Sequence, residues 1–388
     1  QGTILWPPTR QTMLFSATYY GSLVTMLVSG TMADKFGPKR ILMIAILSLT
    51  VLTLSAPMLA EFSYWAYYAS RVLLGMCEGF VIPCVNALGG RWFPPNEKSA
   101  MAALYTSGNQ IAAGSSGLIG SWLCKVPLME GWPVIFYLFG LIGLVWFVML
   151  TYVVSDHPSE NRWIRSDEKE YLEGRVVQKN TKVTSIPWAK ILRSREVYAC
   201  LLCNFTFSFM VSINQNFLPL YFKEELFLPL SMNGLYTTVP FLTQLISKNI
   251  LATVADKLKS SGKMFPTHVV KLFQGIATFG TALILVCLAL FPSCHRPWLA
   301  AVLLFLYGMF FSCGICGFFT SLISIAPSYT GTLTSMSMGC GQLASIIATN
   351  SVSAITYQGW PHKWLIVFCI GAAVQLTSGI FFLIFGSG

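Results

Sequence analysis

Charged residues are scarce in this chain. Asp, Glu, Lys and Arg together make up only 10% of its 388 residues, while hydrophobic residues make up 54%. A soluble domain usually carries about a quarter charged residues. This composition excludes a soluble protein and predicts a polytopic membrane protein, with no room for a large soluble domain.

Motifs of enzyme chemistry are also absent from the sequence. It contains no nucleotide-binding loop, catalytic triad or metal-ligand cluster. Two cysteine pairs, Cys200/Cys203 and Cys313/Cys316, have C-x-x-C spacing, but both lie in apolar helical runs without a nearby histidine. That context favours small buried side chains over metal or redox chemistry. We therefore expect no enzyme, no cofactor and no metal site.

The net charge of +10 does not indicate nucleic-acid binding, because the basic residues gather in short loops between apolar runs. Lys and Arg are enriched in loops on the cytoplasmic side of a membrane. The most basic loops are 34–40, 90–98, 155–196 and 256–263. We expect these loops to face the cytoplasm, with the shorter and more acidic loops on the other side.

Eleven apolar runs are long enough to span a bilayer as helices. They lie near 13–33, 41–59, 64–88, 99–123, 133–154, 197–222, 232–254, 268–292, 298–321, 333–356 and 363–386. Between the fifth and sixth runs, residues 155–196 form a charged linker. The sequence therefore predicts a transmembrane half at 1–154, a cytoplasmic linker at 155–196 and a second transmembrane half at 197–388.

The two halves share an internal repeat. The sequence Ala-Asp-Lys ends the first run at 33–35 and recurs at 255–257, an offset of 222 residues. Sliding the 197–222 run back by this offset places its counterpart ahead of Gln1. We therefore expect eleven helices of a pseudo-symmetric six-plus-six set, with the first helix preceding Gln1 and Gln1 on the non-cytoplasmic side.

Two stretches resemble the motifs of the major facilitator superfamily. "GTMADKFGPKR" at 30–40 is similar to the loop between its second and third helices, and "RVLLGMCEG" at 71–79 is similar to its fourth-helix pattern. The layout of two six-helix halves joined by a cytoplasmic linker agrees with this resemblance. It implies an all-α membrane protein with the major facilitator fold.

Further stretches resemble solute carrier family seventeen, the anion–cation symporters that include sialin, the vesicular glutamate transporters and the type I sodium–phosphate transporters. They are "HPSENRWIRSDEKEYL", "IPWAKILRSREVYA", "FLPLYFKEEL" and "CGFFTSLISIAPSYTGTLTSMSMGCGQLASI". The chain departs from the glutamate transporters at Phe15 and Phe207, where they carry histidine and arginine, and from the family's usual aspartate at Ser324. These departures argue against glutamate and leave sialin-like, phosphate-like and other organic-anion interpretations open.

Arg71 and Glu78 lie inside the 64–88 run. A charge near the centre of a membrane helix costs roughly 2.5–3.5 kcal/mol, so such residues are seldom without a role. Seven residues span two helical turns, about 10 Å, so both side chains can face one cavity. Either they serve transport, with burial favouring a protonated Glu78 that can exchange its proton, or they form a structural ion pair with each other or with a neighbouring residue. The family resemblance implies that Arg71 helps bind the anion and that Glu78 couples protons.

Lys248 either extends to the cytoplasmic surface or provides a second anion contact.

Two further groups complete the candidate site. The loop residues expected to tune the conformational equilibrium at the cytoplasmic gate are Asp34, Lys35, Gly37, Lys39, Arg40 and Asp256, with Gly37 permitting a tight turn. The polar residues that either line the substrate cavity or form interhelical hydrogen bonds are Asn109, Gln110, Asn214 and Gln342.

Together these observations predict a secondary active transporter that moves an organic or inorganic anion by alternating access, coupled to protons or sodium. Its expected partners are a small anion, the coupling ion and the lipid bilayer, with no nucleic acid. The expected membrane is lysosomal, vesicular or plasma. A non-transporting receptor or regulatory membrane protein on the same fold is the alternative.

Overall fold

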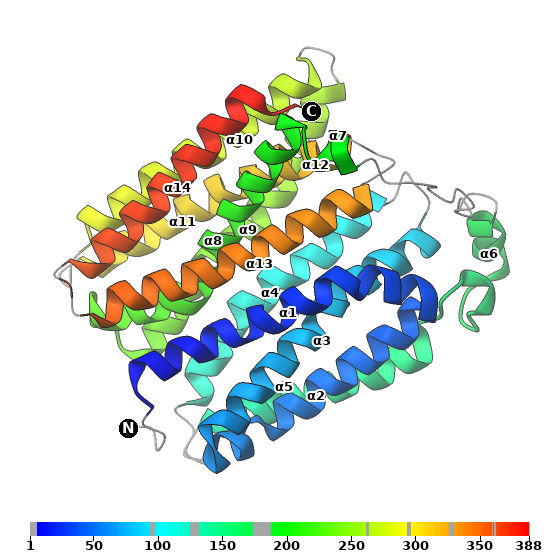
Figure 1. Cartoon of the computed structure of the whole chain (residues 1–388), viewed down its shortest axis with the longest axis horizontal. Helices are drawn as coiled ribbons and strands as arrows, with labels where there is room; N and C mark the ends of the chain where they lie inside the picture. Colours follow the sequence, from blue (N-terminus) through cyan, green and yellow to red (C-terminus); the bar gives the residue numbers. More distant parts are fainter. Residues whose placement is uncertain are drawn as a thin grey trace. The chain divides into compact units, whose positions relative to one another are not determined.

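The computed structural model describes residues 6–93, 98–124, 132–173, 188–260, 264–292, 296–325, 330–358, 360 and 362–387. Within these residues every regular element is a helix (Figure 1). The chain divides into two compact units, of which the first holds Gln1–Thr106 and Leu123–Thr184 and the second holds Ser107–Trp122 and Ser185–Gly388. Helix α4, Lys98–Leu123, contributes to both.

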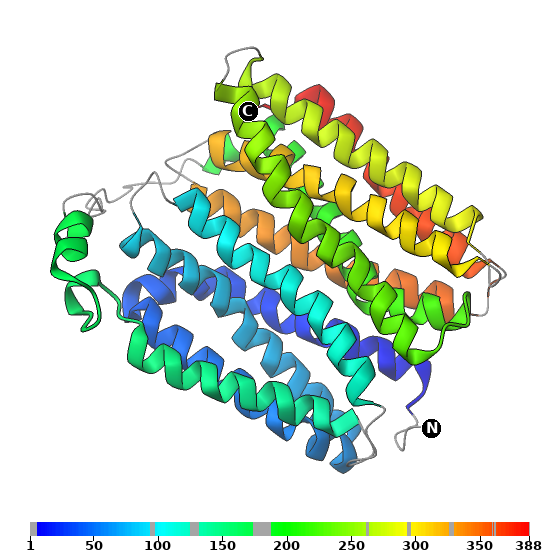
Figure 2. The same cartoon turned by 180° about the vertical axis from the view of Figure 1, so that it is seen from behind.

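The first unit is built on four long helices that lie side by side in Figures 1 and 2. They are α1 (Pro8–Phe36), α2 (Pro38–Phe62), α3 (Tyr64–Trp92) and α5 (Trp132–Val153). The short helices η1 (Pro158–Glu160) and α6 (Ser166–Glu173) follow α5. Only three of the 22 residues of α5 are buried, as expected for a helix whose apolar side chains face lipid.

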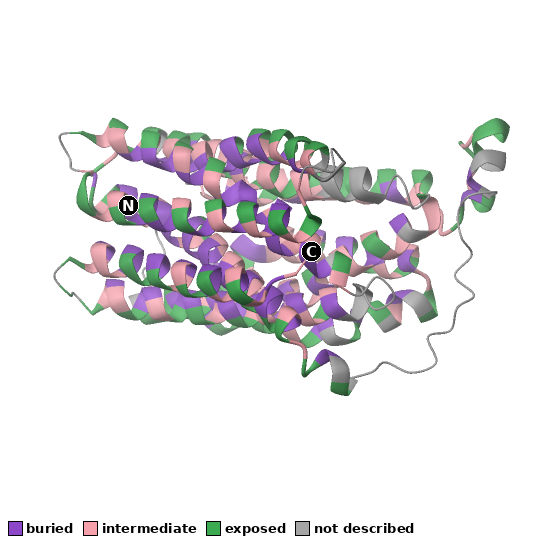
Figure 3. Ribbon diagram, turned by 90° about the horizontal axis from the view of Figure 1, so that it is seen from above, coloured by how far each residue is buried: buried purple, intermediate pink, exposed green. Residues whose placement is uncertain are grey.

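The second unit contains the remaining helices. They are α7 (Trp188–Ile191), α8 (Arg195–Glu224), α9 (Leu230–Ser260), α10 (Pro266–Leu290), α11 (Pro297–Gly314), η2 (Ile315–Phe319), α12 (Thr320–Ile325), α13 (Thr330–Tyr357) and α14 (Lys363–Phe385). Its core packs large apolar residues such as Phe217, Leu285 and Trp364 between the helices. Figure 3 shows buried residues where helices meet and exposed ones on the outward faces.

Every predicted apolar run overlaps one of the long helices, which confirms the all-α membrane fold. Seven of the described helices are apolar enough by length and composition to cross a membrane: α2, α3, α5, α8, α10, α11 continued to Leu322, and α14. The other four long helices, α1, α4, α9 and α13, are more polar. In the sequence repeat α1 corresponds to α9 and α4 to α13, so the more polar helices take equivalent places.

Glycines at equivalent positions let helices approach closely in both units. A Cβ on Gly75 of α3 would clash with the backbone oxygen of Thr18 in α1. A Cβ on Gly308 of α11 would lie 2.7 Å from the backbone oxygen of Pro240 in α9. Pro240 follows Thr18 by the same 222 residues that separate the two Ala-Asp-Lys sequences. The repeat seen in the sequence is therefore also a repeat of packing, in which a small residue brings two backbones together.

Candidate functional site

The two charges of α3 share one face of the helix. A seven-residue separation rotates Glu78 by only about 20° from Arg71 and moves it about 10 Å along the axis. Gly75 lies between them and docks α3 against α1. The packing of α3 on α1 therefore fixes the direction in which both charged side chains leave the helix.

Arg71 is held by an aromatic residue one turn earlier in the same helix. Its Nε donates to the hydroxyl of Tyr67 at 3.0 Å, and its Nη2 donates to the same oxygen. The guanidinium carbon also lies 4.8 Å from the centre of the Tyr67 ring and 5.7 Å from that of Phe136 in α5. These cation–π contacts and hydrogen bonds place the positive charge beside aromatic rings instead of beside a carboxylate.

Glu78 is exposed, and no described residue forms a hydrogen bond or ion pair with it. Arg71 and Glu78 are therefore not an ion pair in this structure. The structural interpretation raised by the sequence, an ion pair, therefore does not hold between these two residues.

The second unit shows what the fold itself requires at these places. Gly308 is the counterpart of Gly75, because each contacts the corresponding residue, Thr18 or Pro240, of its partner helix. The two glycines are 233 residues apart. On these paired helices the same separation matches Arg71 with Leu304 and Glu78 with Phe311. Leu304 is 1% exposed and Phe311 is 4% exposed. Equivalent positions are thus filled by apolar side chains, so helix packing does not demand an arginine and a glutamate there.

An aromatic cluster supports the arginine end of α3. Trp6 lies 5.5 Å from the Tyr67 ring and 5.4 Å from the Tyr64 ring. Trp132 and Phe136 of α5 pack edge to face at 6.0 Å. Large rigid side chains of this kind lose little conformational entropy when they are ordered. They hold the helices around Arg71 in a defined geometry.

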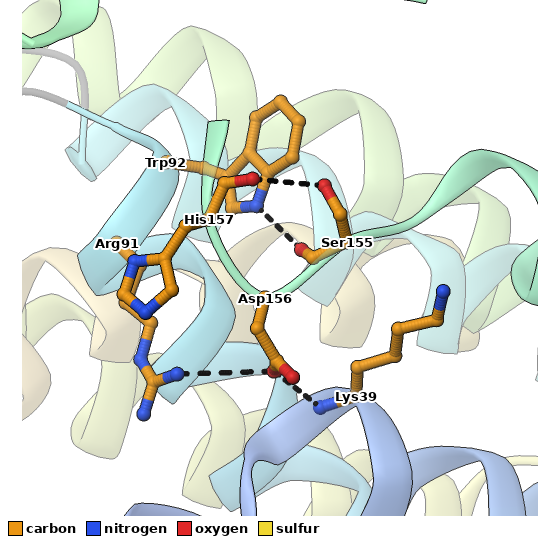
Figure 4. A network of polar contacts seen from close by, with 6 residues as sticks. All are labelled: Lys39, Arg91, Trp92, Ser155, Asp156 and His157. Atoms are coloured by element: carbon orange, nitrogen blue, oxygen red, sulfur yellow. Dashed lines mark hydrogen bonds and ion pairs between the residues drawn. The ribbon is translucent and has the colours of Figure 1, made fainter. Parts of the chain in front are cut away.

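A second polar network joins three helix ends of the first unit around Asp156 (Figure 4). Its Oδ1 accepts a hydrogen bond of 3.0 Å from the backbone N–H of Lys39 and lies 3.8 Å from Nη1 of Arg91. The Lys39 N–H belongs to the first turn of α2, where backbone donors have no partner within the helix and attract negative charge. Trp92 adds a hydrogen bond of 2.9 Å from its Nε1 to the backbone oxygen of Ser155. Asp156 therefore caps α2 and ties it to the ends of α3 and α5.

Two of the predicted gate residues, Gly37 and Lys39, belong to this network. Gly37 has φ of +88°, the turn conformation that the sequence predicted, and a Cβ there would lie 3.0 Å from Oδ2 of Asp156. Lys39 also donates from Nζ to the backbone oxygen of Thr151 at 3.2 Å. Lys35 and Arg40 are exposed. The side chains of Asp34 and Asp256 lie outside the described residues.

The polar candidates in the second unit differ in their surroundings. Asn214 is 5% exposed, and its Nδ2 donates to the Tyr307 hydroxyl at 3.0 Å, which is the interhelical hydrogen bond left open by the sequence. The Oε1 atoms of Gln110 and Gln342 are buried, and no described residue donates to them. Asn109 is exposed. Their roles in binding stay predictions.

Lys248 is 3% exposed. An amine extended to the membrane surface would be accessible, so the snorkelling interpretation of this lysine does not fit the structure. The second interpretation, that Lys248 contacts the anion, stays a prediction.

Sequence reasoning missed Tyr67, Phe136 and Asp156. Tyr67 could have been found, because residues four apart in a helix contact each other. Asp156 also had a signal, since it stands two residues after an apolar run, at the end where the basic loops gather. Phe136 had none, because its contact with Arg71 depends on how α5 packs in the unit.

Comparisons with known proteins agree with this architecture. The sequence model of the Major Facilitator Superfamily matches residues 2–349. The uncharacterized transporter slc-17.3 of Caenorhabditis elegans is 35% identical over 393 residues, covering 100% of this chain and 73% of that protein. A putative inorganic phosphate cotransporter of Drosophila ananassae is 30% identical over 395 residues, covering 100% of this chain and 81% of that protein. The crystal structure of a D-xylose–proton symporter has a TM-score of 0.76 at 14% identity, covering 98% of this chain and 88% of that one, a likeness of fold alone.

Proposed function

Since this chain belongs to the Major Facilitator Superfamily, and within it to solute carrier family seventeen, we propose that Arg71 holds an anion that the protein carries and that Glu78 carries a coupling proton. The protein is a multi-pass secondary transporter and not an enzyme. An anion as cargo is supported by the relative named as an inorganic phosphate cotransporter.

The observation that carries this proposal is the unpaired state of the two charges. Arg71 and Glu78 share a face of α3 without contacting each other, and the equivalent residues of the second unit are Leu304 and Phe311. Retaining two costly charges where the fold accepts apolar side chains indicates a role outside packing. An arginine in a low-dielectric site needs a counter-anion, and a carried anion can supply it.

Phe207 bears on which anion is carried. It stacks on Phe311 with ring centres 4.6 Å apart, so this position of α8 contributes an apolar contact within the second unit. The vesicular glutamate transporters have an arginine there. We therefore favour a phosphate-like or organic-anion substrate over glutamate, with protons or sodium as the coupling ion and a lysosomal, vesicular or plasma membrane as the location.

Substitution of Arg71 tests the proposal. Purified wild-type protein, Arg71→Ala and Arg71→Lys are reconstituted in proteoliposomes, and uptake of radiolabelled phosphate and benzoate is measured. Arg71→Ala is expected to abolish saturable uptake, and Arg71→Lys to weaken it, because lysine lacks the planar two-pronged donor geometry. A well-folded Arg71→Ala variant with wild-type affinity would refute the proposed role. Anion binding without uptake by the wild type would favour a receptor.

A further inference from the structure

The contact between Arg71 and Tyr67 uses one edge of the guanidinium. In α3 the arginine side chain turns back toward the helix N-terminus, as long helical side chains do. Nε and Nη2, which lie on the same edge, both donate to the Tyr67 hydroxyl oxygen. A hydroxyl group has two acceptor lone pairs and one donor hydrogen. Arg71 therefore occupies both acceptor positions of Tyr67 and keeps the N–H groups of Nη1 for another partner.

The hydroxyl hydrogen of Tyr67 is the second free donor at this place. Tyr67 is only 8% exposed, and no described residue accepts a hydrogen bond from its hydroxyl. A hydroxyl that accepts hydrogen bonds from a cation becomes a stronger donor, because linked hydrogen bonds polarise one another. A buried donor without an acceptor is costly, so a ligand that accepts from it gains affinity.

Packing does not explain the hydroxyl. The residue that follows Tyr67 by 233 positions in the repeat is Ala300, which is 0% exposed. The second unit thus fills the equivalent place with a methyl group. The Tyr67 ring is fixed by Trp6 at 5.5 Å, and the guanidinium lies 5.7 Å from the Phe136 ring. The rings fix where the Arg71 guanidinium and the Tyr67 hydroxyl lie, and the hydroxyl adds a hydrogen-bond donor.

We propose that Tyr67 is a second anion-binding residue, which orients the Arg71 guanidinium and donates its own hydroxyl hydrogen to the bound anion. One oxygen of a carboxylate or phosphate then accepts from Arg71 and another accepts from Tyr67. This inference rests on the proposed role of Arg71. It adds a neutral donor that distinguishes this site from a bare arginine.

Removing the hydroxyl tests the inference with little change in shape. Tyr67→Phe is compared with the wild type and with Tyr68→Phe, a neighbouring tyrosine that stacks on Tyr64 at 6.2 Å. Uptake of radiolabelled phosphate and benzoate into proteoliposomes is measured over a range of concentrations. Tyr67→Phe is expected to raise the KM roughly tenfold, the loss of one hydrogen bond to a charged group. Its maximal rate should stay within about twofold of the wild type, and Tyr68→Phe should change neither quantity.

A labelling experiment tests the orienting role without any ligand. Phenylglyoxal attacks free guanidinium groups, and mass spectrometry follows its addition to Arg71. Tyr67→Phe should speed this labelling several-fold over the wild type and Tyr68→Phe, because Nε and Nη2 lose their acceptor. Equal labelling rates in all three proteins would overturn the inference, whatever the transport assay gives.

The two assays also separate this inference from the proposed function. If Arg71→Ala loses anion affinity while Tyr67→Phe keeps the wild-type KM, Arg71 binds the anion alone and the inference on Tyr67 is wrong. If Arg71→Ala keeps its affinity, the proposed function fails, and the labelling result alone decides whether Tyr67 orients the arginine.

Discussion

Asp156 follows the end of α5, yet its Oδ1 accepts a hydrogen bond from the backbone N–H of Lys39 at the start of α2, 3.0 Å away. The residue before Lys39 is a proline, and the N-cap of α2 is Gly37, which has no side chain to cap the helix. The capping group therefore comes from a residue more than a hundred positions later in the chain. This contact fixes α2 against α5 at the end that carries the loop expected to be cytoplasmic.

Substitutions of Asp156 should lower stability in two steps. Asp156→Asn keeps an acceptor for the Lys39 N–H but loses the charge near Arg91, a partly exposed ion pair that contributes at most about 1 kcal/mol. Asp156→Ala loses both, and the missing cap costs about 0.5–2 kcal/mol more. Thermal unfolding of the purified protein should therefore rank wild type above Asn and Asn above Ala. Glu160→Ala, an exposed acidic residue nearby, is the control and should match the wild type. An Ala variant as stable as the wild type would contradict the capping role.

Close helix contact at Gly75 predicts a large effect from one methyl group. Gly75→Ala places a Cβ against the backbone oxygen of Thr18, which can only be relieved by moving α1 from α3, so overpacking of about 1–3 kcal/mol is expected. Gly30→Ala in α1 is the matched control, because a Cβ at Gly30 meets nothing within 4 Å. That change should be neutral or stabilising, since alanine is the better helix former by about 1 kcal/mol.

The melting temperatures of these two variants show whether α1 and α3 are in backbone contact at Gly75. The Gly75→Ala protein should unfold well below the wild type, and the Gly30→Ala protein at or above it. Equal melting temperatures for both variants would show that α1 and α3 are not in backbone contact.

A buried amide in the second unit predicts another stability difference. In the π-helical turn Ile315–Phe319, the backbone N–H of Phe318 donates a hydrogen bond of 3.0 Å to Oε1 of the Gln274 side chain. Gln274→Leu should leave that N–H unsatisfied and cost about 1–3 kcal/mol. Gln375→Leu is the control, since Gln375 is equally buried at 4% exposure and no backbone N–H among the described residues donates to its side chain. Denaturant unfolding in detergent should therefore show a larger loss for Gln274→Leu, and equal losses would count against the π-turn contact.

Hydropathy along the sequence was sufficient to locate the long helices. The predicted run 99–123 corresponds to Lys98–Leu123, and the run 133–154 to Trp132–Val153. Helix ends were harder to predict, because α3 continues to Trp92, past the end of its apolar run at Leu88. Hydropathy also could not show the π-helical turn after α11, since a local change of hydrogen-bond register leaves the apolar pattern unchanged.

The candidate site was only partly predictable. Helical spacing placed Arg71 and Glu78 on one face, because that relation is local to α3. Whether they pair with each other was not decided by the sequence, since an arginine can reach either toward Glu78 or back to Tyr67. Which way it turns depends on contacts such as that with Phe136, which come from another helix. The cap at Asp156 is likewise a tertiary contact, although the charges of the two loops were complementary in the sequence.

The most direct test of the account is the effect of Glu78→Gln on two modes of transport by one preparation. Glutamine mimics the permanently protonated acid, so the variant should keep anion binding and exchange labelled for unlabelled anion across proteoliposomes. It should lose uphill uptake driven by a pH gradient, because no group remains at position 78 to release the proton. This combination, exchange retained and gradient-driven accumulation lost, is the result the account predicts. If the Gln variant still concentrates phosphate or benzoate under a pH gradient as the wild type does, Glu78 is not the proton carrier and the account of α3 is wrong.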